Sequence, residues 1–188
     1  TYSRFFGNKI NDDNNFYLFS ITRNNNYQLD FSNNLTNKLK KIKNYFILES
    51  YGSIKNILKS YFFLSNNKKD IFNDLNKFFN NKFIAKLLTY GIVYIEKPKN
   101  KVFENNLNQF YKKNRINKIL HNMPEFIDGR IINKTFNNYD VNTYSLQHSS
   151  IGDLQFSRFI SMLKILDKIN KNYLSKKIFV ENNIIKKN

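Results

Sequence analysis

Basic side chains are the residues of this sequence best suited to a defined chemistry, because they recur in clusters. Ammonium and guanidinium groups bind phosphates, and each neutralised phosphate releases counterions that favour binding. Clusters spread along a whole chain are typical of an extensive footprint on a folded polyanion such as RNA. The residues predicted to contact RNA in this way are Lys38, Lys40, Lys41, Lys43, Lys97, Lys99, Lys101, Lys112, Lys113, Arg115, Lys118, Lys176, Lys177, Lys186 and Lys187.

Arg130 joins this set for a different reason. Arginine is scarce in the sequence, and its planar fork can hold a phosphate with two N–H groups at once. Any single lysine cluster could equally be a solvated helix face, but a merely solvated surface carries mixed signs. The clusters taken together therefore favour RNA contact.

The overall charge points the same way. The 188 residues include 31 Lys and Arg against 14 Asp and Glu, which gives a net charge of +17. Asparagine, also abundant, would solvate a surface without any charge. An excess of this size on a small chain predicts a polyanionic partner, either nucleic acid or an anionic membrane surface.

Residues for catalysis or metal binding are scarce. The sequence has no cysteine, and its two histidines, His121 and His148, have no ordered pattern of carboxylates beside them. There is no glycine-rich nucleotide motif, no HExxH and no GxSxG. The acidic residues are too scattered for a two-metal nuclease site. We therefore predict no enzyme activity, no catalytic or metal site and no cofactor.

Composition bears on fold and origin. Hydrophobic residues make up 41% of the chain and aromatics 16%, enough for a real core in one domain. The abundant residues Asn, Lys, Ile, Phe and Tyr have codons rich in A and T, whereas the scarce Gly, Ala, Arg and Pro have codons rich in G and C. Such a bias is typical of organelle genomes, some intracellular parasites, reduced endosymbionts and certain large viruses. Among these we expect an organelle-encoded protein, and the predicted location is the mitochondrial matrix.

Hydrophobic periodicity predicts the elements of the first half. Period-two patterns over residues 16–21 and 27–31 flank an Asn-rich turn and predict a β-hairpin. Helical spacing predicts a basic amphipathic helix over 35–46, and residues 54–64 form a helix or a strand. A further helix places Ile71, Leu75, Phe78 and Phe79 on one face. With almost no Ala in the chain, we expect most of Tyr45, Tyr51, Tyr61, Tyr90 and Tyr94 to lie in the core.

The second half is predicted in the same way. Residues 90–95 are β-branched and aromatic and stop at Lys97-Pro98, which predicts a central strand. A helical pattern extends from Leu107 to Leu120, residues 125–150 read as irregular or short-stranded, and a last helix spans 156–173. The prediction is a helix-rich α+β fold with one RNA-binding domain over 1–175 and a basic extension over 176–188. The apolar run over 83–95 is interrupted, so no membrane span is expected.

Three short stretches occur in the order found in a known family. They are Gly7-Asn8-Lys9-Ile10, Ile92-Val93-Tyr94-Ile95-Glu96-Lys97-Pro98 and Ile127-Asp128-Gly129-Arg130-Ile131. In these stretches the chain resembles the small-subunit ribosomal protein three family, whose mitochondrial members are very variable. The Gly-x-x-Gly loop of that family's KH module has no counterpart after Lys101, and the segment after Arg130 lacks the family's further Arg and Glu residues.

The functional hypothesis combines these points. The resemblance implies a structural constituent of the small subunit of an organellar ribosome, with ribosomal RNA and neighbouring ribosomal proteins as partners. The basic clusters would bind the RNA, and aromatic faces would contact the neighbours. The alternatives are a peripheral subunit of an organellar membrane complex and a fragment of a nucleic-acid enzyme.

Overall fold

The computed structural model describes residues 16–20, 44–62, 67–122, 126–147 and 171–180. Over these residues the protein is a helix-rich α+β fold, which confirms the predicted class: helices alternate with short strands that pair in parallel. Contacts group the chain into two compact units. We call residues 1–51 with 114–188 the sheet unit and residues 52–113 the helical unit. The domain bounds 1–175 and 176–188 stay a prediction.

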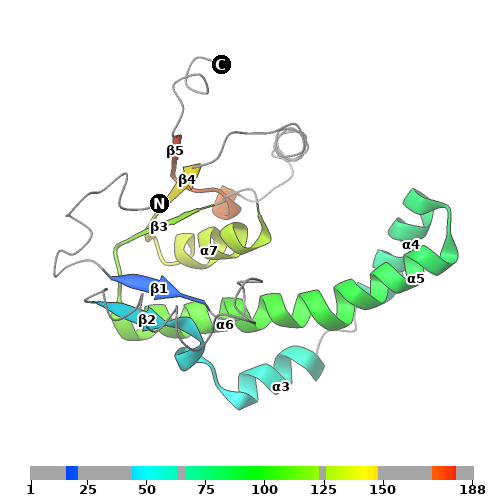
Figure 1. Cartoon of the computed structure of the whole chain (residues 1–188), viewed down its shortest axis with the longest axis horizontal. Helices are drawn as coiled ribbons and strands as arrows, with labels where there is room; N and C mark the ends of the chain where they lie inside the picture. Colours follow the sequence, from blue (N-terminus) through cyan, green and yellow to red (C-terminus); the bar gives the residue numbers. More distant parts are fainter. Residues whose placement is uncertain (1–15, 21–43, 63–66, 123–125, 148–170, 181–188) are drawn as a thin grey trace, which may run out of the picture. The chain divides into compact units, whose positions relative to one another are not determined.

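The sheet unit contains a three-stranded parallel sheet in the order β3 (Lys118–Asn122), β4 (Asn142–Gln147) and β5 (Lys177–Val180). Helix α7 (Ile127–Asn137) connects β3 to β4 and contacts both β4 and the 3-10 turn η6 (Lys171–Tyr173) that precedes β5 (Figure 1). The register pairs Lys118 with Asn142 and Tyr144 with Lys177. Because the strands are parallel, their amino-terminal ends lie at one edge of the sheet.

A second, two-stranded parallel ladder joins β1 (Tyr17–Phe19) to β2 (Tyr45–Ile47), which continues into the 3-10 turn η2 (Leu48–Tyr51). The rings of Phe16 and Phe46 meet edge to face, with centroids 5.2 Å apart. Residues 27–31, the second strand of the expected hairpin, lie outside the described residues, and the partner of β1 here is β2. The expected helix over 35–46 is wrong at its end, since Tyr45 and Phe46 belong to β2; residues 35–43 are not described.

The interior of the sheet unit is partly apolar and partly polar. Ile131, Phe136, Val141 and Leu146 are buried, and full burial of each such side chain contributes about 1.5–3 kcal/mol. The buried polar residues are His121, Asn133, Thr135, Thr143 and Ser145. Burying polar groups is costly unless they are hydrogen-bonded, so this interior requires an internal network.

The helical unit is formed by α3 (Ile54–Phe62), α4 (Lys68–Phe79), α5 (Lys82–Tyr90), the π-helical segment η4 (Gly91–Glu96) and α6 (Lys97–Asn114), whose last residue is assigned to the sheet unit. Gly91 and Lys97 both keep right-handed helical dihedrals, so α5, η4 and α6 form one continuous run of helix. Within η4 the Lys97 N–H donates to the Ile92 carbonyl, the i to i+5 bond of a π turn.

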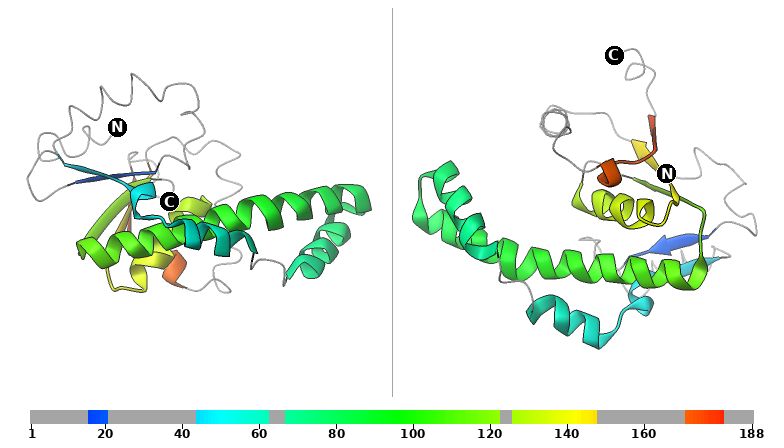
Figure 2. Two further views of the ribbon diagram at one scale, coloured as in Figure 1. Left: turned by 90° about the horizontal axis from the view of Figure 1, so that it is seen from below. Right: turned by 180° about the vertical axis from the view of Figure 1, so that it is seen from behind.

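Helices α4 and α5 form a helical hairpin, seen from two further sides in Figure 2. Asn80 ends α4 in the left-handed region at φ 47°, a conformation that asparagine tolerates. The Asn81 side chain then caps α5, accepting from the N–H groups of Phe83 and Ile84 at 3.0 and 3.1 Å. Ala85 and Thr89, four residues apart, are the buried positions of α5. The two asparagines thus determine the turn, and a seam of small residues lets α4 approach.

Several predicted elements are confirmed and others are wrong. The helix with Ile71 and Leu75 on one face is α4. Residues 54–62, predicted as either helix or strand, form helix α3. The central strand over 90–95 is wrong: these residues are helical, because the buried positions of α5 continue with the same spacing to Val93. The helical pattern is right up to Asn114 but wrong at residues 118–120, which lie in β3.

Two further expectations change. Residues 127–137 are not irregular but form α7, whereas 142–147 are the expected short strand, β4. Of the tyrosines expected in the core, only Tyr51 is not among the exposed large side chains; Tyr45, Tyr61, Tyr90 and Tyr94 are 43%, 51%, 59% and 39% exposed. Residues 156–170 of the last expected helix lie outside the described residues.

Candidate nucleic-acid interface

Four basic residues gather at the amino-terminal edge of the three-stranded sheet. Lys118 begins β3, Lys177 begins β5, and Arg115 and Lys176 lie just before those strands. All four side chains are exposed. Parallel pairing brings these positions together although about sixty residues of sequence separate Lys118 from Lys177. We call Arg115, Lys118, Lys176 and Lys177 the basic edge.

Asn142, the first residue of β4, lies between the two outer strands at this edge. Its backbone N–H donates to the Asn117 carbonyl at 3.0 Å, which helps to align the strands. Its side-chain Oδ1 accepts from Lys176 Nζ at 3.2 Å. The backbone N–H of Lys176 in turn donates to the Thr143 carbonyl at 3.0 Å. The strand starts are therefore fixed by hydrogen bonds, so the basic edge is presented on ordered backbone.

The residues around the basic edge carry mainly positive charge. Asp140, two residues before Asn142, is exposed and adopts the left-handed region at φ 56°. It is the only acidic residue among the described positions 115–122, 138–147 and 171–180. Four cations against one carboxylate leave a surplus that attracts phosphate, and amide groups such as that of Asn142 can hydrogen-bond to the same backbone.

The predicted contact residues of α6 divide into two groups. At its start, Lys99 lies 3.9 Å from Glu96 and Lys101 lies 2.9 Å from Glu104, so both ammonium groups are shared with carboxylates of the same helical run. Lys97 is half-buried. At the other end, Lys112 and Lys113 are exposed in the last turn, where cations also stabilise the helix dipole. Both of these side chains are exposed and so accessible to an external anion.

Arg130 lies in the first turns of α7 and is half-buried. Its Nε is enclosed and has no hydrogen-bond partner among the described residues. An enclosed Nε cannot donate to an external phosphate, so the bidentate grip expected of Arg130 is limited to its terminal nitrogens. Of the other predicted contacts, Lys38, Lys40, Lys41, Lys43, Lys186 and Lys187 lie outside the described residues.

Behind the basic edge lies a buried polar network that links α7, β3, β4 and the segment before β5. The Asn133 amide Nδ2 donates to the Tyr173 carbonyl at 3.2 Å, which turns its Oδ1 toward His121 Nε2, 2.8 Å away. Because an amide oxygen only accepts, His121 Nε2 carries the proton. Ser175 Oγ also donates to Asn133 Oδ1, at 3.1 Å, and contacts Ser145 Oγ.

A second asparagine on the next turn of α7 extends this network. Asn137 Nδ2 donates to the carbonyls of Asn172 and Leu174 at 2.9 and 2.8 Å. Its Oδ1 accepts from Thr143 Oγ1 at 2.9 Å. The two asparagines therefore hold residues 172–175 against α7, and this segment leads directly into Lys176 and Lys177. The network positions half of the basic edge.

A serine, a histidine and an asparagine in contact invite comparison with a nucleophilic triad. In a triad the histidine uses opposite ring nitrogens for the nucleophile and for the orienting residue. Here Asn133 Oδ1 and Ser145 Oγ both approach His121 Nε2, at 2.8 and 3.1 Å. Ser145 is also fully buried. The group has neither the geometry nor the access of a triad, and its visible role is to bind α7 to the sheet.

Sequence reasoning missed this network because its members are polar and distant from one another along the chain. It also treated the clusters at 112–118 and 176–177 as separate. The signal that could have joined them is the pair of strand starts, each marked by a lysine before a short apolar run, Ile119-Leu120 and Ile178-Phe179-Val180.

Comparisons with known proteins give no further guide: no family model, curated protein or solved structure matches this chain. Within the described residues, no group of His, Cys, Asp and Glu could hold a metal ion. The helices of the described part also include none with the length and apolar character needed to cross a bilayer.

Proposed function

We propose that this protein is a non-catalytic structural constituent of an organellar ribosome, in the small subunit of a mitochondrial one. It binds ribosomal RNA through its basic residues and contacts neighbouring ribosomal proteins through its aromatic faces. The observation that carries the proposal is the basic edge, where Arg115, Lys118, Lys176 and Lys177 gather on ordered strand ends. The net charge of +17 supports it.

The physical argument for RNA rests on the kind of surface this edge provides. Flexible ammonium groups on a rigid backbone bind phosphates without requiring a fixed base sequence. Exposed amide groups beside them suit 2′-hydroxyls, which distinguish RNA from DNA. The order of the three short stretches that resemble the small-subunit ribosomal protein three family supports the ribosomal setting and the subunit, although the second stretch, which resembles a strand of that family, is helical here.

The proposal is tested by measuring RNA affinity against salt concentration for the full chain and a charge-reversal variant. Lys118→Glu with Lys177→Glu removes two contacts of the basic edge. Log affinity falls linearly with log salt concentration, and each lost phosphate contact makes that slope shallower by about 0.7 to 0.9. We expect the magnitude of the slope to decrease by roughly 1.5 in this variant, with weaker binding at every salt concentration.

A matched control carries the same change in charge. Lys82→Glu with Lys86→Glu alters two exposed lysines of α5, in the helical unit. We expect this control to retain most of the salt slope. Equal losses in both variants would mean that only net charge matters, and an unchanged slope in the Lys118 and Lys177 variant would refute the basic edge as an RNA contact.

A further inference from the structure

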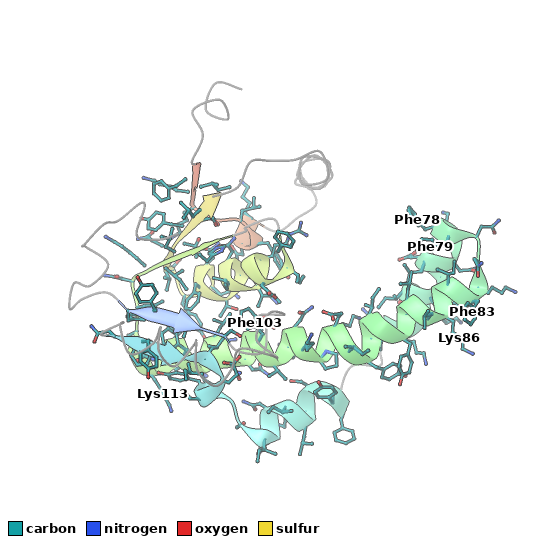
Figure 3. The ribbon with its side chains drawn as sticks, viewed as in Figure 1. Phe78, Phe79, Phe83, Lys86, Phe103 and Lys113 are labelled. Atoms are coloured by element: carbon teal, nitrogen blue, oxygen red, sulfur yellow. The ribbon has the colours of Figure 1, made fainter. Side chains whose placement is uncertain are left out.

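The α4–α5 hairpin exposes large apolar side chains to an unusual degree. Phe78 is 80% exposed, Phe83 75% and Leu87 63%, and Phe79 and Tyr90 are 42% and 59% exposed. In Figure 3, Phe78, Phe79 and Phe83 lie around the end of the hairpin where α4 passes into α5, with Lys86 further along α5. The tip of the hairpin is therefore aromatic, and its rings are exposed in the part of the chain that the structure describes.

The apolar surface continues from this tip along α5 and η4. Phe83, Leu87, Tyr90 and Tyr94 recur at spacings of three and four and form one stripe. The Tyr90 and Tyr94 rings are 4.8 Å apart. Lys68 of α4 donates to the Tyr94 hydroxyl at 3.2 Å and lies 5.2 Å from the centre of that ring. Exposed apolar surface that is contiguous, rather than scattered, marks an interaction site.

The charges around this surface are mainly positive: the exposed carboxylates Asp70, Asp74 and Glu96 are outnumbered by the exposed lysines Lys68, Lys69, Lys77, Lys82 and Lys86. Residues 75–95 contain Lys77, Lys82 and Lys86 and no Asp or Glu. Lys82 and Lys86 each precede a member of the stripe, Phe83 and Leu87, so the ammonium groups border the apolar surface. A partner complementary to this surface would offer an apolar region to the stripe and negative charge to the lysines beside it.

We propose that the α4–α5 hairpin docks on the surface of an anionic lipid bilayer. Phenylalanine and leucine suit the boundary of the acyl chains, tyrosine is enriched at headgroup level, and lysines pair with anionic headgroups. A protein partner with an acidic rim is the alternative occupant, and absence of binding to anionic vesicles would favour it. RNA fits less well, because Ile84, Leu87 and Leu88 cannot stack on bases. The inference does not rest on the proposed ribosomal function.

The test uses the full chain, freed of RNA, in flotation assays with two kinds of vesicle: phosphatidylcholine alone, and phosphatidylcholine mixed with phosphatidylglycerol. We expect binding to the mixed vesicles and much weaker binding to the neutral ones. Phe78→Ser with Phe83→Ser should reduce binding to mixed vesicles by about tenfold or more for each ring that leaves the bilayer. Both side chains are exposed, so the fold should be retained, and circular dichroism checks this.

Two control variants make the result specific. Ile127→Ser with Phe179→Ser removes side chains of the sheet unit that are 51% and 48% exposed, and should leave vesicle binding unchanged. Lys82→Glu with Lys86→Glu should lower binding to mixed vesicles, whereas Lys118→Glu with Lys177→Glu should not.

Three outcomes would overturn the proposal: no binding of the full chain to mixed vesicles, wild-type binding by the Phe78 and Phe83 variant, or equal losses in the sheet-unit control. A loss of RNA affinity in the Phe78 and Phe83 variant, with vesicle binding unchanged, would identify an RNA contact instead. Because RNA affinity is measured separately on the basic edge, failure of lipid docking is distinguishable from failure of the proposed function.

Discussion

Replacing Asn133 by leucine should lower the free energy of unfolding of the sheet unit, because leucine cannot make the hydrogen bonds of the buried amide. Leucine has the same number and branching of side-chain heavy atoms as asparagine, so the change removes hydrogen bonds. Its methyl groups are bulkier than the amide atoms, and any crowding adds to the loss. Asn133 is fully buried and bonds His121 at 2.8 Å, Ser175 at 3.1 Å and the Tyr173 carbonyl at 3.2 Å. Each bond is worth about 1 kcal/mol net, so we expect a loss of about 3 kcal/mol, and more if His121 keeps an unpaired N–H.

The measurement is urea unfolding followed by circular dichroism and by the fluorescence of the chain's 12 tyrosines, which no tryptophan obscures. A loss of this size corresponds to a fall in melting temperature of roughly 10 °C for a chain of this length. The control is Asn138→Leu at the C-cap of the same helix, since Asn138 is exposed and its side chain accepts one bond, from Asn172 at 2.9 Å. It should cost less than about 1 kcal/mol. Equal losses for the two variants would refute the reasoning.

Three other perturbations test the fold. Ala85→Leu should destabilise the hairpin by about 1–3 kcal/mol, because Ala85 is fully buried and has no room for a larger side chain; an unchanged urea midpoint would contradict this packing. Asn81→Ala removes the cap on Phe83 and Ile84 and should cost about 1 kcal/mol in the same assay, with retained stability showing that the cap is dispensable. Burial raises the pKa of Tyr17 above its ordinary 10.0, so its contribution to stability is complete below pH 10 and is lost as pH rises through the higher folded value. Ultraviolet titration should show a late-ionising phenol that Tyr17→Phe removes, and loss of a phenol that ionises near the ordinary pKa of 10.0 would contradict it.

The sequence was a good guide where burial is apolar and local. Helix α4 follows from the spacing of Ile71 and Leu75, which are half-buried in the structure. Residues 90–95 were wrongly predicted as a strand, because short β-branched and aromatic runs do not by themselves distinguish strand from helix. The deciding signal was the spacing of four from Ala85 through Thr89 to Val93, which continues the buried helix face.

Hydrophobic periodicity could not predict helix α7, and the reason is physical. Its buried face includes Asn133 and Thr135, so the apolar pattern of a helix is broken. The partners that satisfy Asn133 lie at residues 173–175 and at His121, and no local pattern indicates them. The basic edge was hidden similarly: its lysines are visible in the sequence, but only parallel pairing of β3, β4 and β5 brings them together.

The most direct test of the ribosomal assignment is sedimentation of a lysate of the organelle, with and without RNase, following this chain by mass spectrometry. The account predicts that the chain sediments with the small ribosomal subunit and leaves that position after RNase treatment. A chain that sediments away from ribosomal subunits, at a position that RNase does not change, would contradict it.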